Sequence, residues 1–201
     1  MDRIVIAVTG MPGSGKSLIA HTIAEALDAP VYSMGDVVRR EVARRGLEVN
    51  VENVEMIATK LREELGRAAV AILLSREIAG EEGFIVVDGL RSLDEARVLR
   101  GDGRLCIVAV HASPLTRYRR LLSRGRKDEI RGWEDFALRD RKNLEYGIGG
   151  AIAMADYMVV NEGSIEEARE QALAIAERVR VDEGKSCSGG GVPADRGPGE
   201  G

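Results

Sequence analysis

The chain has 201 residues, of which 44% are hydrophobic and 31% charged, a composition typical of one globular domain rather than of a disordered or membrane-embedded chain. Its formal net charge of -4 excludes a surface that is basic throughout, so nucleic-acid binding is not expected unless a local patch supports it. The N-terminus lacks a signal-peptide pattern, and no apolar run reaches the ~18 residues of a membrane span. We therefore expect a cytoplasmic protein without a membrane partner.

The two cysteines stand in unlike surroundings. Cys106 lies in an apolar run, whereas Cys187 lies in a segment rich in Gly and Ser. This difference predicts neither a disulfide framework nor a metal site, and it indicates a reducing compartment.

Five short apolar runs, mostly of β-branched residues, are predicted as strands at 4–8, 31–33, 84–87, 105–110 and 157–160. A segment with helical spacing or strong helix formers follows each run. Because the runs lack polar alternation, we predict a parallel sheet covered by helices on both faces, which is the α/β class. The longest helical pattern covers 51–79, and Gly66 is expected to divide it into two helices.

The domain is expected to span residues 1–182. From Glu183 onward the composition shifts to Gly, Ser and Pro among scattered charges, which cannot form a packed core. We therefore expect residues 183–201 to be a disordered tail that buries nothing.

The first predicted strand runs into GMPGSGKS, the full Gly-x4-Gly-Lys-Ser pattern of a phosphate-binding loop (P-loop). Its glycines let backbone N–H groups turn toward phosphate oxygens, Lys16 reaches the β and γ phosphates, and Ser17 binds magnesium. The pattern predicts a P-loop NTPase, a three-layer sandwich with a parallel five-stranded sheet and a short lid, that binds ATP and Mg²⁺. The predicted nucleotide-binding residues are Gly10, Met11, Pro12, Gly13, Ser14, Gly15, Lys16 and Ser17.

A second motif, DGLR, begins at Asp88, after the strand predicted at 84–87. An acid at the end of a neighbouring strand can hold magnesium together with Ser17, so Asp88 is a predicted metal ligand and catalytic residue. Gly89 follows where many hydrolytic P-loop machines carry a water-activating glutamate, which disfavours a motor or ATPase. A guanine-reading Asn-Lys-x-Asp is also missing, which disfavours a GTPase switch.

Two further segments carry charges suited to phosphate. In GDVVR, Asp36 and Arg39 stand one helical turn apart, so that Arg39 can reach an acceptor phosphate or carboxylate, although an N-cap with a solvent-facing arginine explains the pair as well. Between residues 117 and 142, ten Lys and Arg face five Asp and Glu. Such a run suits a triphosphate, or it is a solvated helical face.

Together the P-loop, GDVVR, DGLR and RLLSRGRKD resemble adenylate kinase and its UMP/CMP kinase relatives over roughly residues 3–182. The resemblance implies an acceptor-binding helical region at 34–80, a lid at 117–142, and an acceptor phosphate bound by Arg39 and Arg91. It also implies that lid arginines contact the donor nucleotide and the transferred phosphoryl group. The matching positions are Arg120, Arg124, Arg126 and Arg139, with Arg124 and Arg126 predicted as catalytic.

The C-terminal stretch ADYMVVNEGSIEEAREQ resembles the last strand and helix of dephospho-coenzyme A kinase. The whole set resembles an archaeal family of adenylate-kinase-like proteins. Two acceptors therefore stay open: a nucleoside monophosphate, which needs no base, and dephospho-coenzyme A, for which Asp36 would accept the hydroxyl proton. A regulatory ATP-binding protein that acts on RNA through the 117–142 patch is the third possibility. A monomer or a homodimer is expected.

Overall fold

The computed structural model describes residues 3–123, 130–189 and 191. Five strands form one sheet: β1 (Ile4–Thr9), β2 (Val31–Ser33), β3 (Phe84–Leu90), β4 (Arg104–His111) and β5 (Tyr157–Val160). The helices between β1 and β3 are α1 (Lys16–Leu27), α2 (Met34–Arg44), α3 (Val51–Leu65) and α4 (Ala69–Glu77). After β3 come α5 (Leu93–Arg100), α6 (Pro114–Ser123), α7 (Trp133–Glu145), α8 (Ile148–Ala153) and α9 (Ile165–Asp182).

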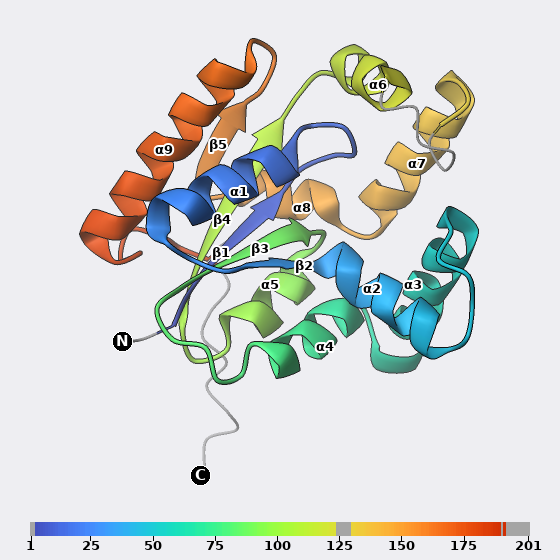
Figure 1. Cartoon of the computed structure of the whole chain (residues 1–201), viewed down its shortest axis with the longest axis horizontal. Coiled ribbons are helices and arrows are strands. Elements are labelled where there is room, and N and C mark those ends of the chain that lie inside the picture. The colour runs from blue at the N-terminus through green and yellow to red at the C-terminus, as the bar shows by residue number, and fades with distance from the viewer. Residues whose placement is uncertain (1–2, 124–129, 190, 192–201) are drawn as a thin grey trace.

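All neighbouring strands are parallel, and the sheet order is β2-β3-β1-β4-β5. Every residue of β1 is buried, as its unbroken apolar run requires. Helices α1 and α9 pack on one face of the sheet, and α2 to α5 with α8 pack on the other (Figure 1). The predicted three-layer α/β architecture is thus confirmed. No helix in the described part of the chain is both long and apolar enough to cross a membrane.

Local chemistry sets the boundaries near the carboxyl edge of the sheet. Ser33 and Ser92 cap the amino ends of α2 and α5, each accepting a hydrogen bond from a backbone N–H three residues on. The predicted helix over 51–79 is divided into α3 and α4 at Gly66, which takes a positive φ of 85°. Helices α2 and α5 therefore begin at the carboxyl ends of β2 and β3, the edge of the sheet where P-loop proteins bind their ligands.

Strand β3 is longer than the sequence indicates, because it continues past Asp88. Val8 pairs with Asp88, but Thr9 pairs with Leu90, so β3 carries one extra residue at Gly89. Gly89 has a φ of 104°, a conformation that the extra residue of a bulge needs and that glycine adopts without strain. Asp88 therefore lies within the strand, directly before a bulge.

The C-terminal segment differs from expectation in two ways. Cys106 and Cys187 form a disulfide with Cα atoms 5.0 Å apart, contrary to the prediction that they do not pair. The segment also docks: Arg104 Nη1 donates to the carbonyl oxygen of Glu183 (2.6 Å), and the N–H and hydroxyl of Ser188 both donate to Asp156 (2.6 Å each). Helix α9 runs back over the sheet, so the residues that follow it lie beside the start of β4. The expectation that the tail buries nothing is therefore wrong for residues 183–189, and residues 190 and 192–201 lie outside the described chain.

Candidate active site

The P-loop lies between β1 and α1, as the sequence predicts. Gly10 and Gly15 have φ values of 146° and 96°, and a Cβ at either position would overlap a neighbour, the carbonyl of Val110 or the amide of Asn161. Within the described chain, α1 has neither a side-chain cap nor an acidic residue in its first turn. The positive end of the helix dipole therefore faces the loop without a competing acid, which favours an anion there.

Lys16 and Ser17 open α1 beside this loop. The Lys16 ammonium donates to the carbonyl oxygen of Met11 (3.2 Å), and the Ser17 hydroxyl donates to Asp88 Oδ2 (2.7 Å). The other carboxylate oxygen of Asp88 is buried and has no hydrogen-bond partner among the described residues. A hydroxyl beside a carboxylate with a spare oxygen fits Mg²⁺, which prefers oxygen ligands.

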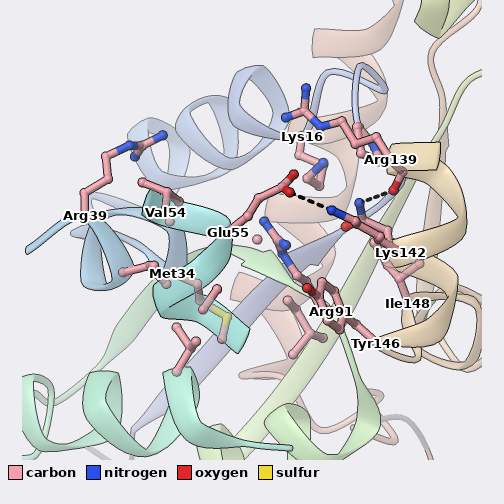
Figure 2. Close-up of a pocket in the computed structure, with 18 of the residues that line it drawn as sticks. Lys16, Met34, Arg39, Val54, Glu55, Arg91, Arg139, Lys142, Tyr146 and Ile148 are labelled. Atoms are coloured by element: carbon pink, nitrogen blue, oxygen red, sulfur yellow. Dashed lines mark hydrogen bonds and ion pairs between the residues drawn. The ribbon is translucent and has the colours of Figure 1, made fainter. Parts of the chain in front are cut away.

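A cavity of about 300 Å³ extends from the P-loop between α2 and α3 on one side and α7 on the other. Figure 2 shows Lys16 of α1, Glu55 of α3, Arg91 of the loop after β3 and Arg139 of α7 converging on it. The cationic side chains that line it are Lys16, Arg39, Arg62, Arg91, Arg139 and Lys142. Among the described residues, two carboxylates, Glu55 and Glu95, line it as well. The cavity therefore favours an anionic ligand.

Arg91 follows the bulge of β3, and its backbone N–H donates to the carboxylate of Glu95 (2.7 Å). Glu95 is 1% exposed, and burial raises the pKa of its carboxyl group; Arg62 also contacts it (3.5 Å). Burial likewise lowers the pKa of the Arg91 guanidinium. Arg62 also stacks on the Tyr146 ring (4.2 Å). This part of the cavity thus holds the guanidinium groups of Arg62 and Arg91 near one buried carboxylate, that of Glu95.

An ion pair crosses the cavity. Lys142 on α7 donates to Glu55 on α3 (2.8 Å), and this contact raises the pKa of the lysine. The two residues are 87 positions apart. Sequence reasoning missed Glu55, Arg62 and Tyr146, and it counted Lys142 only as one of the cations of the 117–142 patch.

Arg39 and Asp36 are placed differently from Arg91. Their side chains form an ion pair with each other, and both are about half exposed. Arg39 lines the outer part of the cavity and lies apart from Arg91 and Arg139, beside Val54 (Figure 2). Asp36 is not among the described residues that line the cavity.

The lid arginines divide into three groups. Arg124 and Arg126 lie outside the described residues. Arg139 projects from α7 toward Lys16 (Figure 2). Arg120 donates to the backbone and side-chain oxygens of Asn161 (3.0 and 3.3 Å), and thus lies behind the P-loop.

The fold and the loop together define the class: this is a P-loop domain of kinase-like α/β type, which implies nucleotide binding. A family model described as an AAA domain matches residues 9–137. The chain is 48% identical over 178 residues to the UPF0200 protein of Hyperthermus butylicus, covering 88% of this chain and 95% of the relative. It is 50% identical over 176 residues to the UPF0200 protein of Aeropyrum pernix, covering 87% and 93%. The chain therefore belongs to the UPF0200 family.

Solved structures with the same fold include two small-molecule kinases. A shikimate kinase from Bacteroides thetaiotaomicron gives a TM-score of 0.61 at 20% identity, covering 88% of this chain and 98% of that chain. A gluconokinase from Sinorhizobium meliloti gives 0.58 at 21% identity, covering 89% and 94%. At this identity the likeness concerns the fold alone.

Proposed function

We propose that the protein is an ATP-dependent phosphotransferase that moves the γ-phosphoryl group of ATP to a nucleotide-like acceptor of the nucleoside monophosphate type. The observation that carries this proposal is the continuity of the cavity, which runs from Lys16 at the P-loop to the guanidinium groups of Arg91 and Arg62. An anionic acceptor held there would lie beside the donor's terminal phosphate. Aliphatic side chains on α2 and α3, such as Val38 and Val54, offer an apolar surface for a base.

In the proposed reaction, the bond between the γ-phosphorus and the β–γ bridging oxygen breaks, and a bond from phosphorus to an acceptor oxygen forms. Lys16 and Arg139 would neutralise charge on the transferred group. Mg²⁺, held by Ser17 and Asp88, would supply further charge neutralisation at the phosphate oxygens. A phosphate acceptor is already ionised at neutral pH, so no residue needs to take a proton.

The alternative acceptor, dephospho-coenzyme A, attacks through a hydroxyl and needs a proton acceptor. Asp36, the residue expected to fill that role, is paired with Arg39 and is not among the described lining of the cavity. The RNA-binding alternative depends on free cations over 117–142, but Arg117 is buried and Arg120 bonds Asn161. Both alternatives thus have less support than the nucleotide acceptor.

The test is a coupled assay of ADP release with ATP, Mg²⁺ and one acceptor at a time: AMP, CMP, UMP or dephospho-coenzyme A. We expect release that depends on a nucleoside monophosphate and disappears in Lys16→Ala. Release with dephospho-coenzyme A alone would favour the alternative acceptor. Slow release that no acceptor stimulates would contradict the kinase proposal.

A further inference from the structure

Two carbonyl oxygens on the outer side of the P-loop are bonded to side chains from distant elements. Arg117 Nη1, from α6, donates to the carbonyl oxygen of Pro12 (3.1 Å). Asn161 Nδ2, from the end of β5, donates to the carbonyl oxygen of Ser14 (2.8 Å). The proposed phosphotransfer assigns no role to either side chain.

These two contacts fix the orientation of two peptide planes. No cis peptide occurs in the described chain, and in a trans peptide the C=O and the following N–H point in opposite directions. A Pro12 carbonyl held toward α6 thus turns the N–H of Gly13 the other way, and Gly13 lines the cavity. A Ser14 carbonyl held toward β5 does the same for the N–H of Gly15, the N-cap of α1. N–H groups turned inward in this way are what a phosphate-binding loop needs.

The Arg117 contact is itself held by a buried ion pair. Arg117 is 4% exposed, and two of its nitrogens donate to the two carboxylate oxygens of Asp140 (2.8 and 2.6 Å), while Nε donates to Ala112 (3.1 Å). Asp140 lies on α7 beside Arg139. The same side chain therefore ties the P-loop to the helix that carries a cation of the cavity.

The Asn161 contact is supported in the same manner. Arg120 bonds both the backbone and the side-chain oxygen of Asn161, which leaves the amide nitrogen directed at Ser14. A Cβ at Gly15 would overlap that nitrogen, so the glycine permits the close approach.

Burial of an ion pair contributes little net stability, because desolvation of the two charges offsets their attraction. We propose that Arg117, held by Asp140, and Asn161 are positioning residues that fix the carbonyls of Pro12 and Ser14, so that the P-loop N–H groups are already oriented for a nucleotide's phosphates. This inference rests on the nucleotide binding included in the proposed function.

The test combines calorimetric titration with Mg-ATP and thermal melting of the unliganded full-length chain. In Arg117→Met with Asp140→Leu, the buried pair is replaced by apolar side chains of similar size. In Asn161→Leu, Arg120 keeps its bond to the backbone oxygen. We expect each variant to bind ATP about tenfold more weakly or worse, since each loses a hydrogen bond that orders the loop, while its melting temperature stays close to that of the native chain.

Matched controls are Arg40→Met with Glu77→Leu, an exposed ion pair, and Asn53→Leu, whose amide donates to the carbonyl oxygen of Glu48 rather than to a carbonyl of the P-loop. Both should bind ATP like the native chain. Native-like ATP affinity in Arg117→Met with Asp140→Leu and in Asn161→Leu would overturn the positioning role. Failure of both of these variants to fold would overturn it as well. If the native chain itself does not bind ATP, nucleotide binding fails and the inference fails with it.

Discussion

Reduction of the Cys106–Cys187 disulfide should lower the stability of the fold by several kcal/mol. The bond closes a loop between residues 81 positions apart. The chain-entropy relation gives about 4.5 kcal/mol for a loop of this length, lost when the unfolded chain regains its freedom. For a domain of this size, that loss corresponds to a fall of about 10 °C in melting temperature.

The assay compares thermal unfolding of the native chain and of Cys187→Ser, each with and without a reductant. The reductant should lower the melting temperature of the native chain to that of Cys187→Ser, which should itself be insensitive to the reductant. Titration of free thiols in the native chain should find none before reduction. An unchanged melting temperature after reduction to two free thiols would refute the loop-closure reasoning.

Three further outcomes are expected. Asp88→Asn should abolish the Mg²⁺ dependence of ATP binding, measured by calorimetry with and without EDTA, because an amide lacks the negative charge that the carboxylate offers to Mg²⁺. Arg91→Ala should raise the KM for the acceptor about tenfold and leave the KM for ATP nearly unchanged, since it removes a charged contact from one ligand only. Hydrogen bonds and charge from Arg44 and Arg45 lower the pKa of Glu41 from 4.5 to about 2, so Glu41 stabilises the fold above pH 4.5 and this stabilisation is lost as the pH falls toward 2. Glu41→Gln should therefore lower the melting temperature at pH 7, by a margin that shrinks over that acidic range.

Each of these outcomes has a contradicting result. Retained Mg²⁺ dependence in Asp88→Asn would show that residues other than Asp88 bind the metal. Arg97→Ala is the control for Arg91→Ala, because Arg97 pairs with Asp94 on the surface; equal effects of the two would rule out an acceptor contact. A melting-temperature difference for Glu41→Gln that does not vary with pH would show that packing, rather than charge, dominates.

The nucleotide-binding end could be predicted because its chemistry is local in the sequence. Eight consecutive residues form the P-loop. The apolar runs of β1 and β3 are short, and the segments that follow them have the residue spacing of helices. The bulge at Gly89 has no such signature, since a glycine after an aspartate is as typical of a turn. Placement of Asp88 inside the strand therefore came only from the paired register.

The rest of the site depends on contacts between distant segments. Glu55 and Lys142 each have the sequence character of an exposed helical position, and only the placement of α3 opposite α7, across the cavity, brings them together. Arg117 stands in a run of basic residues typical of a solvated face, yet it is buried against Asp140. Cys187 lies in a segment whose composition predicts disorder, and it reaches Cys106 because α9 returns the chain to the start of β4.

The central claim is tested most directly by transfer of the terminal phosphate itself. The native chain would be incubated with ATP labelled at the γ-phosphate, Mg²⁺ and a mixture of AMP, CMP, UMP and dephospho-coenzyme A, and the labelled products separated. We predict label in a nucleoside diphosphate from the native chain and none from Lys16→Ala. Label found only in inorganic phosphate, at equal rates with and without the acceptors, would contradict the assignment of the protein as a phosphotransferase.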